Sequence, residues 1–67
     1  MTEVIIKDGP GFQLRLKKWE SISPKGLYAV HFIQGTKDRD GNIDNESTYE
    51  FFMDAEELSN LAKALAK

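Results

Sequence analysis

The chain has 67 residues, which is the length of a single domain spanning residues 1–67. It contains no cysteine, so neither a disulfide nor a cysteine-bound metal can support the small core that such a length allows. No stretch approaches the roughly 18 apolar residues of a membrane helix, and no apolar run at the N-terminus is typical of a signal peptide. We therefore expect an intracellular protein, cytoplasmic or nucleoid-associated, without a membrane partner.

The charge is unevenly distributed along the chain. The formal net charge is −2. Residues 1–37 hold six Lys or Arg and three acids, net +3, whereas residues 38–67 hold three Lys or Arg and eight acids, net −5. Because a local field steers a polyanion more than the total charge does, the N-terminal half remains a candidate nucleic-acid surface.

Four strands are predicted in chain order. "EVIIKD" (3–8) is β-branched and ends in the turn "DGPG", and "FQLRLKKWE" (12–20) alternates apolar and polar residues. After the loop "SISPKG" (21–26), "LYAVHFIQG" (27–35) is the third strand. A hairpin centred on Asp40-Gly41 leads to "STYEFFM" (47–53). These short connections favour an antiparallel meander.

A helix follows within "MDAEELSNLAKALAK" (53–67). Asp54 is a suitable N-cap, and Glu57 three residues later completes a capping-box pattern. The stripe of Leu58, Leu61, Ala62 and Leu65 indicates one buried helix face. The predicted fold class is α+β: a four-stranded antiparallel sheet followed by one C-terminal helix. Because so short a chain benefits from added burial, we also expect a homodimer.

One helix covers only one face of such a sheet, so the two faces have different roles. We expect the core face to carry Phe12, Leu14, Leu16, Tyr28, Val30, Phe32, Phe51 and Met53. The opposite face carries Gln13, Arg15, Lys17, Trp19, His31 and Phe52. That second face is exposed to solvent, forms an interface with a partner, or binds a ligand.

Catalytic chemistry is sparse in this sequence. There is one histidine and no cysteine, and no nucleophile elbow, phosphate-binding loop or dinucleotide fingerprint occurs. His31 is interpreted as a hydrogen-bonded strand histidine. "DRDGNIDNE" resembles a run of calcium ligands, but its glycine comes one residue too early for an EF-hand loop, which favours a solvated hairpin tip. We expect no enzyme activity, no cofactor and no metal.

The face opposite the core carries the side-chain types of a single-stranded nucleic-acid site. Such sites combine cations along the backbone with rings on which bases stack. Trp19 lies beside cations in the sequence, Phe52 offers a second ring, and further lysines extend the charge; the cations are Arg15, Lys17, Lys18, Lys7, Lys25 and Lys37. Two other interpretations stay open: Trp19 packs over the sheet rim or under the 21–26 loop, or the cations merely solvate an exposed face.

With this layout the chain resembles the C-terminal domain of the transcriptional coactivator positive cofactor four. The similar segments are "LRLKKW", "KG" (25–26), "DRDGNI" and "FMDAEELSNL". The resemblance implies a curved sheet with one helix, a homodimer, and single-stranded DNA bound on the sheet. It implies that Lys17 and Lys25 contact DNA, that Trp19 stacks on bases, and that the dimer interface includes Leu58, Leu61 and Leu65.

The sequence departs from that family on the third and fourth strands. Ile33 and Thr36 stand where the family has a DNA-contacting arginine and tryptophan, and the fourth strand carries acids where the family is basic. The expected function is sequence-independent single-stranded DNA binding in transcription, replication or recombination, with proteins of those processes as further partners. The alternative is a small acidic regulator or inhibitor that binds a protein and ignores DNA.

Overall fold

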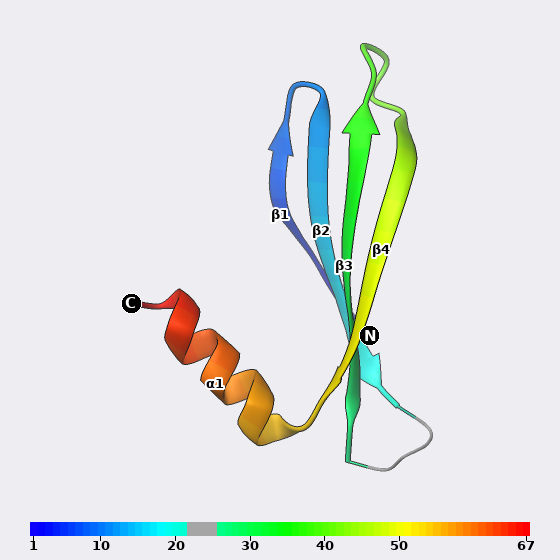
Figure 1. Ribbon diagram of the computed structural model, residues 1–67. Coiled ribbons are helices and arrows are strands. Elements are labelled where there is room, and N and C mark those ends of the chain that lie inside the picture. Colours follow the sequence, from blue (N-terminus) through cyan, green and yellow to red (C-terminus); the bar gives the residue numbers. More distant parts are fainter. Residues whose placement is uncertain (22–25) are drawn as a thin grey trace.

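The fold is a four-stranded antiparallel sheet followed by one helix, as the sequence predicts (Figure 1). A computed structural model describes residues 1–21 and 26–67. The sheet order is β1-β2-β3-β4, with each strand beside its neighbour in the chain. The strands are β1 (Thr2–Gly9), β2 (Phe12–Glu20), β3 (Tyr28–Lys37) and β4 (Ile43–Met53), and the helix is α1 (Ala55–Leu65).

The β3–β4 hairpin is longer than predicted. β4 starts at Ile43 rather than at residue 47, because Ile43 and Asp44 still pair with the end of β3. The extension includes a register shift between Gln34 and Thr36 and a positive φ of 53° at Asn45. Such bulges bend and twist a strand pair locally. At the tip, the Asp38 side chain accepts hydrogen bonds from the backbone N–H groups of Asp40 and Asn42, at 2.9 Å each.

Gly35 makes the bulge possible. A Cβ at this position would lie 2.5 Å from Cγ2 of Ile43, closer than side-chain atoms approach one another in proteins. The glycine therefore lets the Ile43 side chain cross over β3 at the point where the register shifts.

The register divides the sheet into the two predicted faces. Residues paired across the strands point to the same side, and neighbours along a strand point to opposite sides. The apolar face carries Val4, Lys7, Phe12, Leu14, Leu16, Lys18, Tyr28, Val30, Phe32, Tyr49, Phe51 and Met53. The other face, called here the Trp19 face, carries Glu3, Ile5, Asp8, Gln13, Arg15, Lys17, Trp19, Ala29, His31, Ile33, Thr48, Glu50 and Phe52.

The helix does not cover the apolar face, contrary to the expectation from the sequence. α1 leaves the end of β4 and points away from the sheet, and none of its residues is buried (Figure 1). Met53 ends β4 and Ala55 starts α1, so Asp54 alone connects them. Asp54 is held by the predicted capping box: its carboxylate accepts from the Glu57 N–H at 2.8 Å, and Glu57 accepts from the Asp54 N–H at 3.0 Å. This connection is shorter than the about 2–6 residues that usually join a strand to a helix packed on its sheet.

The best-buried apolar residues are consequently few. Among the described residues they are Ala29, Val30 and Ile33, all on β3. Ala29 and Ile33 belong to the Trp19 face, where larger side chains from β2 lie beside them. The aromatic residues predicted to form the core are only half-buried or exposed, Phe51 among them. No helix within residues 1–21 and 26–67 has the length and apolar character needed to cross a bilayer.

Candidate nucleic-acid interface

Two aromatic rings flank a small residue at one end of the Trp19 face, where β2 and β4 end and β3 begins. Trp19 on β2 pairs with Ala29 on β3, which pairs with Phe52 on β4. Because adjacent strands lie about 4.8 Å apart, the Trp19 and Phe52 backbones are separated by about 10 Å. Phe52 is 50% exposed and Ala29 only 3%. Trp19, Ala29 and Phe52 thus form a row across three neighbouring strands, called here the aromatic row, in which the small side chain of Ala29 lies below the level of the two rings.

His31 fixes the position of the Trp19 ring. The ring centroids of Trp19 and His31 are 4.5 Å apart at an interplanar angle of 74°, an edge-to-face contact of the kind aromatic rings prefer. On its other side, Nε2 of His31 lies 2.6 Å from Oε2 of Glu50. The sequence prediction of a hydrogen-bonded strand histidine is therefore confirmed. The contact also holds Trp19 within the face, which limits its rotamer freedom before any ligand arrives.

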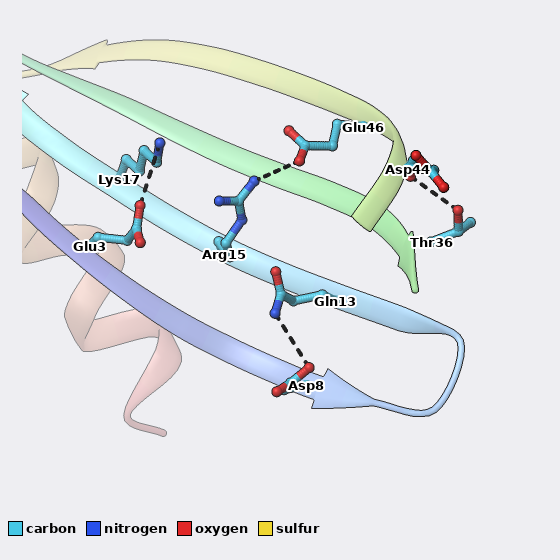
Figure 2. Close-up of polar contacts among 8 residues, drawn as sticks. All are labelled: Glu3, Asp8, Gln13, Arg15, Lys17, Thr36, Asp44 and Glu46. Carbon is cyan, nitrogen blue, oxygen red and sulfur yellow. Dashed lines mark hydrogen bonds and ion pairs between the residues drawn. The ribbon is translucent and has the colours of Figure 1, made fainter. Parts of the chain in front are cut away.

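The two central cations of the face are paired with acids from other strands (Figure 2). Nη2 of Arg15 lies 3.0 Å from Oε1 of Glu46, so the arginine reaches from β2 across β3 to β4. Nζ of Lys17 lies 3.4 Å from Oε2 of Glu3 on β1. Their side chains are 20% and 30% exposed, so both charges remain accessible at the surface.

Lys37 lies apart from this centre, near the turn between β1 and β2. Its Nζ is 2.7 Å from Oδ1 of Asp8, which also accepts from Nε2 of Gln13 at 3.3 Å. The hydrogen bond from Lys37, supported by that from Gln13, holds the pKa of Asp8 below its ordinary value. An open hollow lies between the two hairpin tips, lined by Asp8, Gly9, Pro10, Gly11, Lys37, Asp38 and Arg39.

The structure separates Lys7 and Lys18 from the predicted site. Lys18 stands between Lys17 and Trp19 in the strand, so alternation turns it to the apolar face, where its Nζ lies 5.1 Å from the Tyr28 ring centroid. A register shift between Ile5 and Lys7 turns Lys7 to the same side, with Nζ 5.9 Å from the Phe12 ring centroid. Lys18 therefore does not stand beside Trp19, and Lys7 does not extend the positive charge of the Trp19 face, contrary to both expectations.

The remaining predicted residues fall into two groups. Arg15, Lys17, Trp19 and Phe52 do share one face. Lys25 lies outside the described residues. Sequence reasoning missed the acidic partners Glu3 and Glu46. Counting the hairpin register back from Gly9 and Phe12 would place Glu3 opposite Lys18, and the register shift between Ile5 and Lys7 is what brings Glu3 opposite Lys17.

The carboxylates give this face a mixed character. They are Glu3, Asp8, Glu46 and Glu50, and they outnumber the cations Arg15, Lys17 and Lys37. Within the part of the chain that the structure describes, no three of its acidic or histidine side chains are grouped so as to hold a metal ion. No family model matches the chain, and neither a curated protein nor a solved structure matches it.

Proposed function

We propose that the chain is a non-enzymatic single-stranded DNA-binding protein that acts inside the cell as a homodimer. The observation that carries the proposal is the row of Trp19, Ala29 and Phe52 across three strands, with Arg15 and Lys17 beside it. The β-β-β-β-α order and the segment "LRLKKW" support a relationship to positive cofactor four. Transcription, replication and recombination all expose such DNA.

Stacking supplies the sequence-independent part of the binding. Every base has a π-face, and a base stacked on an aromatic side chain contributes about 1–3 kcal/mol. Trp19 is already oriented by His31, so little rotamer entropy remains to be lost when a base stacks on it. The low centre at Ala29 leaves space above β3 between the two rings. Bases therefore lie on the two rings, and the sugar-phosphate chain runs toward the cations Arg15 and Lys17 on β2.

Phosphates bind by replacing carboxylates. Arg15 and Lys17 hold Glu46 and Glu3 in the free protein. Surface ion pairs of this kind contribute only about 0–1 kcal/mol each, so a phosphate displaces them at small cost. The guanidinium of Arg15 suits phosphate in particular, because it presents paired N–H donors. The acids reduce affinity without preventing binding.

The test is a titration of the protein with oligo-dT at low and moderate salt, following the fluorescence of Trp19. We expect quenching, and an affinity that falls as salt rises. Labelled oligo-dT anisotropy then serves for variants without tryptophan. Trp19→Ala should weaken binding by about 1–3 kcal/mol while the circular dichroism spectrum stays unchanged. Unfolding of Trp19→Ala would instead show that Trp19 is a packing residue at the sheet rim.

Lys17→Ala tests the role of the cation, and Lys63→Ala is its matched control. Both remove one lysine charge, but Lys63 lies in the last turn of α1, away from the Trp19 face. Each phosphate contact to a single strand contributes about 0.7 to the slope of log K against log salt. Lys17→Ala should lower that slope by about this amount, and Lys63→Ala should not. Equal slopes for both variants would exclude Lys17 from the contact set.

One observation favours a second candidate function. Arg15, Lys17 and Lys37 each have an acidic partner, and Glu50 adds a further carboxylate to the same face. Such a surface also fits a small regulator or inhibitor that binds a protein with a basic patch, with Trp19 as an interface hot spot. No fluorescence change at low salt, with the protein folded and a basic protein partner binding it, would establish this function instead.

A further inference from the structure

A row of ionisable side chains crosses the sheet next to the aromatic row. It takes one residue from each strand, and the register places them opposite one another in the order Glu3, Lys17, His31 and Glu50. Cβ atoms of directly opposed residues lie about 4.5–5.5 Å apart, so neighbours in this row interact. Trp19 and Phe52 stand two positions further along β2 and β4, on the same face.

Glu50 differs from the other carboxylates of this face in the kind of partner it has. Three acids lie against Lys or Arg: Glu3 against Lys17, Asp8 against Lys37, and Glu46 against Arg15. Lys and Arg stay charged throughout the neutral pH range. Glu50 lies against His31, and histidine is the side chain that changes its charge between about pH 5 and 8. Within residues 1–21 and 26–67, the charge of Glu50 is therefore compensated only when His31 is protonated.

The contact with Glu50 determines where His31 takes up a proton. A carboxylate accepts hydrogen bonds and donates none, so in the 2.6 Å contact the hydrogen belongs to Nε2 of His31, which donates to Oε2 of Glu50. Nδ1 is then the nitrogen of the neutral ring that accepts a proton from water. The charged ring keeps the same hydrogen bond and turns it into an ion pair. Protonation thus changes the charge of the face without releasing the ring that orients Trp19.

The charged groups around His31 come from both neighbouring strands. On β4, Glu50 favours the protonated ring. On β2, Lys17 stands directly opposite His31, and Arg15 stands two positions away on the same face. The positive charges of these two residues oppose protonation of the imidazole. A phosphate bound to either of them offsets that opposition, because it brings a negative charge to the same place.

From these contacts we propose that His31 takes up one proton when single-stranded DNA binds the Trp19 face, so that binding strengthens as the pH falls from about 8 to 5.5. The inference rests on the proposed function and specifies how pH regulates that site. At high pH the negative charge of Glu50, two positions from Phe52 on the same face, repels the sugar-phosphate chain. A protonated His31 compensates this charge beside the ring on which a base stacks, where the His31 and Trp19 centroids are 4.5 Å apart.

The test is labelled oligo-dT anisotropy at pH 8 and pH 5.5, at constant ionic strength and with a dye whose emission does not change with pH. Thymine and phosphodiesters do not titrate in this range, and His31 is the only histidine of the chain. Both pH values lie above the isoelectric point of about 5.2, so the net charge keeps its sign. Coupling between two sites is commonly about 5- to 150-fold, and the 49% exposure of the Glu50 side chain favours the lower end. We therefore expect the wild type to bind about 5-fold more tightly at pH 5.5.

His31→Gln and Glu50→Gln test the two partners separately. Glutamine keeps a donor for Glu50 but takes up no proton, so His31→Gln should bind at both pH values as the wild type does at pH 8. Glu50→Gln removes the repelling charge, so at pH 8 it should bind more tightly than the wild type. Glu56→Gln changes the net charge equally on α1 and should gain less. A histidine with a purely structural role would leave the wild-type affinity independent of pH.

The same titrations distinguish a failed inference from a failed function. Equal pH dependence in wild type and His31→Gln overturns the proton uptake and leaves DNA binding standing. No binding at either pH overturns the proposed function, and the inference with it. Should His31→Gln unfold, as judged by circular dichroism, NMR of the wild-type imidazole replaces it: by reciprocity, the ring must become protonated at a higher pH when oligo-dT is bound. An imidazole titration that oligo-dT does not move overturns the inference.

Discussion

Replacing Glu46 by glutamine should strengthen DNA binding. The substitution keeps the size of the side chain and removes the charge that Arg15 holds at 3.0 Å. The two side chains are 20% and 43% exposed, so the pair belongs to the solvent-screened class that contributes about 0.2–1 kcal/mol. A phosphate no longer has to displace this partner. The dissociation constant for oligo-dT should therefore fall about 1.5- to 5-fold.

The assay is the Trp19 fluorescence titration at low salt, where surface electrostatics are least screened. Glu3→Gln should act in the same direction but less strongly, because the Lys17 to Glu3 distance is longer at 3.4 Å. Glu56→Gln is the control: it changes the net charge equally but lies in the first turn of α1. If Glu46→Gln and Glu56→Gln gave the same gain, total charge would explain it. Unchanged or weaker binding of Glu46→Gln would refute the phosphate-for-carboxylate exchange.

Three further outcomes are expected. Gly35→Ala should lower the free energy of unfolding by about 1–3 kcal/mol in urea, because its Cβ meets Ile43 at 2.5 Å, and the loss should shrink in an Ile43→Ala background. Asp54→Ala should remove the capping box and cost about 0.5–2 kcal/mol in the same assay, with lower helicity by circular dichroism. Backbone N–H donors, that of Asn42 foremost, lower the pKa of Asp38 below its ordinary 3.8. The hydrogen bonds to the ionised Asp38 carboxylate therefore stabilise the fold fully above pH 3.8, and this stabilisation is lost as the pH falls through the lower pKa of the folded state. An NMR titration of the Asp38 side chain should show the lowered pKa, and Asp38→Asn should remove both that titration and this part of the pH dependence of stability.

Local patterns were sufficient to predict the elements and the two faces. Alternation along "FQLRLKKWE" placed Trp19 with Arg15 and Lys17, and the spacing of Asp54 and Glu57 predicted the helix start. Both depend on neighbours within a few residues, and the physics that decides them is equally local: side-chain direction in a strand and satisfaction of free N–H groups.

The cross-strand details required the register and were not predicted. The partners of Arg15 and Lys17 are 31 and 14 positions away in the chain, and a shift of one residue would turn them to the other face. The bulge between Ile5 and Lys7 is such a shift, and it moved Lys7 away from Trp19. A single sequence carries no clear signal for a bulge in a β-branched run such as "VII".

The direction of α1 depends on the length of its connection to β4 rather than on a pattern of residues along the helix. Its leucine stripe predicted one buried helix face, whereas no residue of α1 is buried in the structure. With Asp54 as the whole connection, the end of β4 fixes where α1 points. Phe51 and Phe52 stand at adjacent positions on β4 but on opposite faces: Phe51 belongs to the apolar face and Phe52 to the aromatic row. Because a strand turns neighbouring side chains to opposite sides, a substitution at one of these two residues can alter one face of the sheet without altering the other.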